Sequence, residues 1–196
     1  SRGLTLFAAA AMVRADMTAA DEQDISLGRY TGMLARQYRF PEFLTSLERL
    51  DELVAQAPDL CPPGRNRNVK VTLDVGGRHV VMAVKVFGRQ PAVKDWIDAF
   101  RSSKAKRTWM GAEHLARKNV GTPTPIGFLE RWDGARLPES YFLAEFQDKV
   151  TSFRDELVRL FHEDPDCEKF MSLLQCVADA VRTMHDAGFL HNDLGN

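Results

Sequence analysis

The chain has 196 residues, of which 44% are hydrophobic and 27% charged, values typical of a globular protein with a buried core. Its 26 lysine and arginine residues face 27 aspartate and glutamate residues, so the overall charge gives no reason to expect a nucleic-acid partner. The longest early apolar run, Leu4 to Val13, covers about a third to a half of the roughly 20 residues that a bilayer span requires, which excludes a membrane-spanning helix there.

The cysteines, Cys61, Cys167 and Cys176, are odd in number and lack the spacing of metal ligands. This argues against a disulfide framework and is typical of a reducing cytoplasm, so we expect a cytoplasmic protein with its thiols buried as small apolar side chains.

Residues 1–60 are expected to form a helical N-terminal extension. The first 20 or so are rich in alanine, which predicts a loosely attached helix or disorder. From Tyr30 onward apolar residues return with helical spacing, and five of them lie on one face of a helix that Pro58 ends: Phe43, Leu44, Leu47, Leu50 and Val54. The loop from Cys61 to Asn68 is rich in proline, and we place a domain boundary at its start.

Beyond this loop the apolar period changes to two, which predicts strands. Residues 69–75 alternate, Gly76-Gly77 provides a two-residue turn, and residues 80–87 return as a second strand. A helical run follows from Pro91 to Phe100. Ser102 or Ser103 is placed to cap another helix, whose apolar face carries Trp109, Ala112, Leu115 and Ala116.

Two further strands and a second helical region complete the chain. Residues 126–132 and 141–146 read as strands joined by an Asp133-Gly134 turn. Asp164 before Pro165 predicts the cap of a long helix whose apolar stripe is Phe170, Leu173, Leu174, Val177, Val181 and Met184. The element order predicts an α+β fold with parts at residues 1–60, 61–147 and 148–196.

Two side chains are candidates for phosphoryl-transfer chemistry. Asp193 lies in a His-x-Asp-Leu loop after the Gly188 helix stop, where a carboxylate can orient an acceptor hydroxyl. Lys85 lies on the second hairpin strand in Val-Ala-Ile-Lys-like surroundings, where an ammonium can hold nucleotide phosphates. The alternative without a function is that Lys85 is a solvated lysine at the edge of a strand and that the His-x-Asp-Leu motif around Asp193 arose by chance.

From about Val69 to Asn196 the chain resembles the bacterial lipopolysaccharide kinases, the heptose and Kdo kinases of the protein-kinase-like superfamily. The resemblance is carried by residues 83–87, 103–109, 121–125 and 185–194, in that order and spacing. It implies a kinase-like fold with a small β-rich N-lobe (61–147) and the start of a C-lobe (148–196), ATP and Mg²⁺ as cofactors, and a sugar hydroxyl of the lipopolysaccharide core as acceptor.

The resemblance also assigns further residues. Glu113 is the only glutamate on the helix that should pair with Lys85, although alignment on Trp109 puts the expected position nearer Thr108. Glu145 to Gln147 fall where kinases link their lobes, so their backbone groups are expected to meet the adenine. Asn196 follows Asp193 by three residues and not five, so we assign no metal ligand.

Some alternatives stay open. The same fold serves protein and small-molecule kinases, and a non-catalytic pseudokinase or a binding module cut off at the catalytic loop is the competing class. Between Arg89 and Lys118 eight basic residues face three acidic ones, which suggests a surface for phosphates or an anionic inner membrane, or simply a solvated helix face. The acceptor's identity and the oligomeric state do not follow from the sequence.

Overall fold

The computed structural model describes residues 22–60, 67–88, 102–134, 136–148, 150–163 and 165–190. The chain divides into two compact units. The first, which we call the sheet unit, comprises Asp16–Glu113 and Pro123–Phe146. The second, the helical unit, comprises Ser1–Ala15, His114–Thr122 and Gln147–Asn196, and each unit is described by itself.

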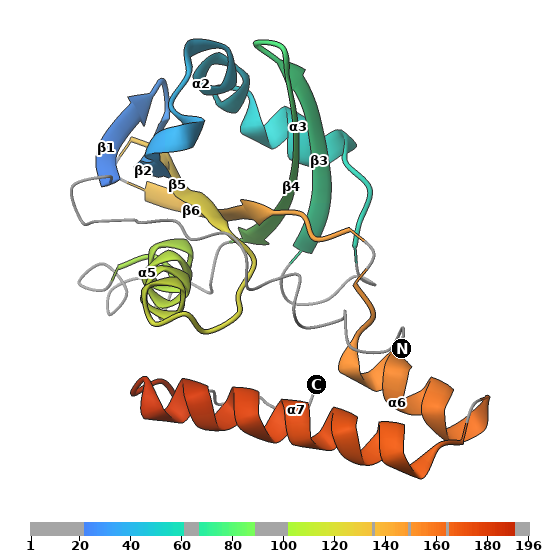
Figure 1. Ribbon diagram of the computed structural model, residues 1–196. Coiled ribbons are helices and arrows are strands. Elements are labelled where there is room, and N and C mark those ends of the chain that lie inside the picture. The colour runs from blue at the N-terminus through green and yellow to red at the C-terminus, as the bar shows by residue number, and fades with distance from the viewer. Residues whose placement is uncertain are drawn as a thin grey trace. The chain divides into compact units, whose positions relative to one another are not determined.

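The sheet unit contains a six-stranded sheet in the order β1-β2-β5-β6-β4-β3, with every neighbouring pair antiparallel. Figure 1 shows α2 and α3 on one face of this sheet and α5 on the other. The strands are β1 (Glu22–Leu27), β2 (Tyr30–Ala35), β3 (Arg67–Val75), β4 (Arg78–Phe87), β5 (Pro125–Asp133) and β6 (Arg136–Glu145). The helices are η3 (Arg36–Tyr38), α2 (Pro41–Leu47), α3 (Leu50–Gln56) and α5 (Lys104–Arg117), which ends in the helical unit. The predicted α+β class is confirmed.

The central hairpin has the predicted form. Strands β3 and β4 pair from Arg67 opposite Val86 to Val75 opposite Arg78. The turn residues Gly76 and Gly77 have φ of 56° and 70°, a left-handed conformation that glycine adopts without a steric penalty.

The helical extension expected over residues 1–60 is wrong for residues 22–35, which form the hairpin β1–β2. Gly28, with φ of 57°, begins a two-residue loop, and Ile25 and Leu27 alternate with polar neighbours, so a strand signal was present. Strand β2 then pairs with β5, which makes these residues part of the same sheet as the rest of the unit. The predicted helix after Pro41 is real but divided into α2 and α3. Residues 1–21 and the predicted helix over 91–100 lie outside the described residues.

Apolar side chains fill the face of the sheet that carries α2 and α3. Alternate residues of β3 and β4 are buried there, and the two helices contribute their predicted apolar stripe. The main contributors are Val69, Val71, Met82, Val84, Phe43, Leu47 and Leu50. Burial of this apolar area, at about 25 cal/mol per Å², is the main term holding the unit together.

A polar network ties α3 to the strands beneath it. The Tyr30 hydroxyl donates to Asp51 Oδ1 at 2.8 Å, and the backbone N–H of Asp51 donates back to the hydroxyl at 3.2 Å. The guanidinium of Arg29 also pairs with the Asp51 carboxylate, and Arg131 Nη1 lies 3.5 Å from it. Although burial acts to raise the pKa of Asp51, the bonds from Tyr30 and Arg29 outweigh burial and lower it.

The helical unit contains α6 (Phe153–His162) and α7 (Cys167–Asp186). The cap of α7 is Asp166, which accepts from the backbone N–H groups of Glu168 and Lys169, and not Asp164 as predicted. A carboxylate directly before the first helical residue is placed to reach these N–H groups. Cys167 and Cys176 are exposed, contrary to the expectation of burial. None of the described helices combines the length and apolarity that crossing a membrane requires.

Candidate functional site

The candidate site starts from Lys85 on β4, whose register fixes the face of the sheet that it shares. Lys85 lies opposite Phe142 of β6, and Phe142 lies opposite Phe128 of β5. Directly paired residues in an antiparallel sheet project to the same face. Lys85, Phe142 and Phe128 therefore form a row across three strands, and the Cα atoms of Lys85 and Phe128 are about 10 Å apart at the usual strand spacing.

Helix α5 covers this face. The ring of Trp109 packs on that of Phe128, with centroids 6.5 Å apart, and Lys106 Nζ lies 6.0 Å from the Phe128 ring. Ser103, one of the two predicted candidates, caps the helix, because its hydroxyl accepts from the backbone N–H of Lys106 at 3.0 Å. The side of the sheet that carries Lys85 is thus the side on which α5 packs (Figure 1).

Glu113 belongs to the buried stripe of α5. Ala105, Trp109 and Glu113 follow one another at intervals of four residues, and their exposed fractions are 0%, 1% and 1%. Residues four apart lie above one another on a helix, so Glu113 faces the sheet together with Trp109. A buried carboxylate is costly unless it is paired, and the half-buried Lys85 is a cation on the facing sheet surface.

The alternative position on this helix has a different environment. Thr108 is half-buried, and its hydroxyl donates to the Lys104 carbonyl at 2.9 Å, a bond within the same helix. The Thr108 hydroxyl is therefore already bonded to the backbone of its own helix, whereas Glu113 is the acid that α5 buries.

The end of β6 carries the residues expected to meet adenine. The Glu145 backbone N–H donates to the Thr124 carbonyl at 2.8 Å, and that of Phe146 donates to the Val81 carbonyl at 3.0 Å. Neither N–H is available to a ligand while these bonds persist, so an adenine contact here has to use other backbone groups. Gln147 is exposed and begins the last stretch of the helical unit.

Two side chains near this end were not singled out in the sequence. The Tyr38 hydroxyl donates to a carboxylate oxygen of Glu145, and burial together with this bond raises the pKa of Tyr38. Lys70 lies opposite Ala83, on the same face as Lys85, and its Nζ is 4.2 Å from the Phe146 ring centroid. No local sequence pattern predicts either contact, because each joins segments far apart in the chain.

Asp193 lies outside the described residues, so its predicted role stays a prediction. Within the described part of the chain, no group of three His, Cys, Asp or Glu side chains is placed to hold a metal ion, and we identify no residues there that fit Mg²⁺. An open depression of about 150 Å³, lined by Ser46, Arg49, Glu52, Leu53, Gln56 and Leu73, lies beside α2 and α3, and so on the face opposite Lys85.

No protein-family profile matches the sequence, and a search of curated proteins gives no match. Among solved structures, the chain is similar to one described as WaaP in complex with acyl carrier protein, with a TM-score of 0.48 and 17% sequence identity. The match covers 76% of this chain and 53% of the other, so the chain spans about half the length of the protein that it matches. A match at this identity assigns no activity, substrate or partner to this chain.

Proposed function

We propose that the chain is a nucleotide-binding, kinase-like phosphotransferase in which Lys85 holds the phosphates of ATP and Glu113 pairs with Lys85. The observation that carries this proposal is the burial of Glu113 on the stripe of α5 that packs on the Lys85 face of the sheet. A lysine held by a carboxylate on the neighbouring helix is the arrangement by which kinases fix the ammonium that contacts the phosphates.

The acceptor that we propose is a sugar hydroxyl of the lipopolysaccharide core, with Asp193 orienting the hydroxyl. Support comes from the sequence motifs that resemble lipopolysaccharide kinases, above all Ala83-Val84-Lys85 and His191-Asn192-Asp193-Leu194. Phosphoryl transfer depends on positioning and charge neutralisation, so the roles of Lys85 and Asp193 are separable: the first binds nucleotide, the second directs the attacking oxygen.

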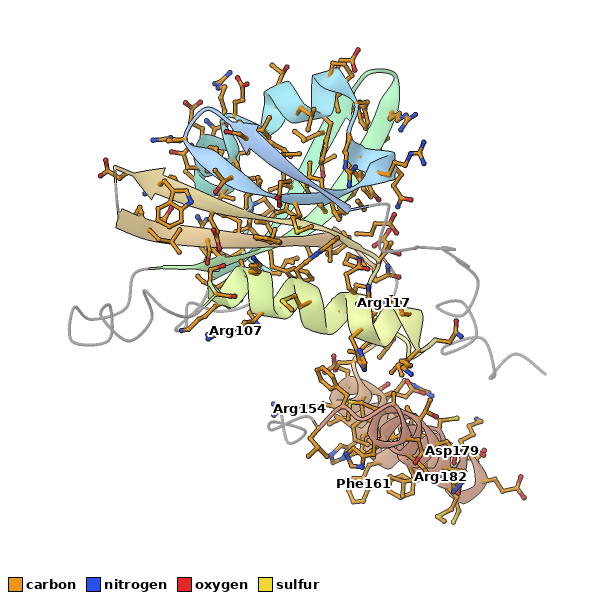
Figure 2. The ribbon with its side chains drawn as sticks, turned by 90° about the vertical axis from the view of Figure 1, so that its left-hand side faces the viewer. Arg107, Arg117, Arg154, Phe161, Asp179 and Arg182 are labelled. Carbon is orange, nitrogen blue, oxygen red and sulfur yellow. The ribbon has the colours of Figure 1, made fainter. Side chains whose placement is uncertain are left out.

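Thermal unfolding of the full chain with increasing Mg-ATP tests the proposal that Lys85 belongs to a nucleotide site. A ligand at a hundred times its dissociation constant stabilises the folded state by about 2.7 kcal/mol, which is readily measured. We expect Lys85→Met to abolish most of the ATP-dependent rise in Tm. Arg182→Met is the matched control, because Arg182 is an exposed cation on α7 in the helical unit (Figure 2), and it should respond as wild type. An absent response in the wild type, or equal responses in both variants, would refute the nucleotide site.

Transfer of labelled phosphate from ATP to a purified core oligosaccharide tests the proposed acceptor. If the full-length protein supplies the metal ligands, the expected result is transfer by the wild type and none by Asp193→Asn, which should still give the ATP-dependent rise in Tm. ATP binding without transfer to any acceptor would favour the non-catalytic module, and transfer to a protein or a small alcohol would replace the proposed acceptor.

A further inference from the structure

The face of the sheet that carries Lys85 is only partly covered over strands β3 and β4. Half-buried side chains on this face are Asn68, Lys70, Val81, Ala83 and Lys85. The residues of the two strands that alternate with them point to the other face and are buried. Cationic and apolar groups on the Lys85 face are therefore accessible to a ligand.

The two lysines of this face extend toward opposite ends of it. Lys85 Nζ lies 5.5 Å from the centroid of the Phe87 ring, and Phe87 is opposite Ser140 of β6. Lys70 Nζ lies 4.2 Å from the centroid of the Phe146 ring, directly after the other end of β6. An extended chain from Ser140 to Phe146 covers about 20 Å. A single phosphate group does not contact both ammonium groups, whereas an elongated ligand can.

The position of Lys70 is fixed without occupying its hydrogen-bond donors. Within the described part of the chain, Lys70 makes no ion pair. The Phe146 ring attracts the ammonium through the negative potential of its face, and an ammonium has three N–H donors. The ring contact therefore holds Lys70 Nζ in place and leaves donors for a ligand.

The end of β6 is itself held in position. The side chain of Glu145, opposite the buried Met82, accepts a hydrogen bond from the Tyr38 hydroxyl. Neighbouring side chains of an extended chain point to opposite faces, so this bond helps to keep the Phe146 ring on the Lys70 side. The backbone N–H groups of Glu145 and Phe146 already donate to carbonyls of Thr124 and Val81. A ligand at this end therefore depends on a side-chain donor, and Lys70 supplies one.

We propose that Lys70 contacts the base of the nucleotide whose phosphates Lys85 holds, and that its ammonium donates a hydrogen bond to a ring nitrogen of the purine. The inference rests on the proposed function and deepens it, because it assigns a residue to the other end of the ligand. A nucleotide is elongated, with its negative charge at one end and neutral acceptors on an aromatic ring at the other. This distribution matches two ammonium groups that extend apart, one of them beside an aromatic side chain.

The test compares Mg-ATP with Mg-tripolyphosphate, which has a phosphate chain and no base, by isothermal titration calorimetry of the full chain. Lys70→Met should weaken ATP binding about tenfold or more, because a hydrogen bond from a charged donor is lost. Its affinity for tripolyphosphate should change by less than about twofold, because the Lys70 ammonium extends away from Lys85 and salt screens the remaining attraction. Lys85→Met should weaken the binding of both ligands.

Two further variants sharpen this comparison. Lys70→Arg keeps the cation, its donors and its stacking on an aromatic ring, so its ATP affinity should stay within about threefold of wild type. Lys118→Met is the matched control, because Lys118 is an exposed lysine of the helical unit, and it should bind both ligands as wild type does. A general loss of stability in Lys70→Met would weaken both ligands, so the test depends on the difference between them.

Each outcome decides the role of Lys70. Equal losses for the two ligands in Lys70→Met would make Lys70 a phosphate ligand and overturn the proposal, and so would a wild-type affinity for ATP. If Lys85→Met loses both ligands while Lys70→Met behaves as Lys118→Met, the nucleotide site stands and only the role of Lys70 fails. Absence of ATP binding in the wild type would refute the proposed function and this inference together.

Discussion

The proposed pairing of Lys85 with Glu113 gives a prediction in which a second mutation rescues the first. Lys85→Met leaves the carboxylate of Glu113, which is 1% exposed, without its proposed cation. Removing one partner of a buried pair costs about 3–5 kcal/mol, and we expect the lower end, about 3 kcal/mol, because Lys85 itself is only half-buried. Glu113→Leu leaves an ammonium that can reach water, so that variant should lose only about 1 kcal/mol.

The double variant Lys85→Met/Glu113→Leu replaces the proposed pair by apolar side chains of similar size, and such a replacement is often neutral. It should therefore be more stable than Lys85→Met alone by about 2 kcal/mol or more, measured by urea unfolding with far-ultraviolet circular dichroism. Lys104→Met combined with Glu113→Leu is the control, because Lys104 lies on the opposite side of α5 and its effect should simply add. Additivity of the Lys85 and Glu113 effects within about 0.5 kcal/mol would show that the two side chains do not interact.

Three further predictions concern the sheet unit. Asp51 has a lowered pKa in the folded state, so its stabilising contribution is present above the unfolded value of 3.8 and is lost as the pH falls through the folded pKa. Asp51→Asn should therefore be less stable than the wild type at neutral pH and should lose less stability on acidification. Urea unfolding at pH 7 and pH 3 measures both effects. Gly127→Ala would place a Cβ 2.3 Å from the Met33 carbonyl oxygen and should cost about 3 kcal/mol, whereas Gly121→Ala, with no atom within 4 Å, should be nearly neutral in the same assay. Ser103→Ala removes the cap of α5 and should cost about 1 kcal/mol, while Ser102→Ala, at an exposed position, should cost little; equal effects would contradict the capping bond.

Local sequence patterns predicted secondary structure correctly where the burial of one face of an element restricts its residues. The alternation over residues 69–75 and 80–87 and the two glycines between them predicted the β3–β4 hairpin, because strand period and left-handed turn geometry leave few alternatives. The hairpin β1–β2 was not predicted. The apolar spacing from Tyr30 onward indicated a helix, and the two-residue loop at Gly28 was not read as a hairpin turn. Strand β2 owes its place to pairing with β5, a partner almost a hundred residues away that short-range spacing does not reveal.

In the candidate site, too, some residues could be predicted from the sequence and others could not. Lys85 was visible in the sequence because a lysine among small apolar residues on a strand has a recognisable chemical pattern. Whether Glu113 or a position near Thr108 pairs with Lys85 was left open, and the structure shows that Glu113 is buried on the stripe of α5 that packs on the sheet, with Trp109 on Phe128. The Tyr38–Glu145 bond was not foreseen, since nothing in either segment specifies the other.

The sequence by itself determined the strands of the central hairpin and the lysine on which the proposed function rests, and it narrowed the cap of α5 to Ser102 or Ser103, because each depends on residues within a few positions of one another. Only the tertiary structure decided that residues 22–35 complete the sheet and that Glu113 is the acid buried on the stripe of α5 that packs on it. These properties depend on how a helix is rotated and which strands become neighbours, and long-range packing, not local preference, sets both.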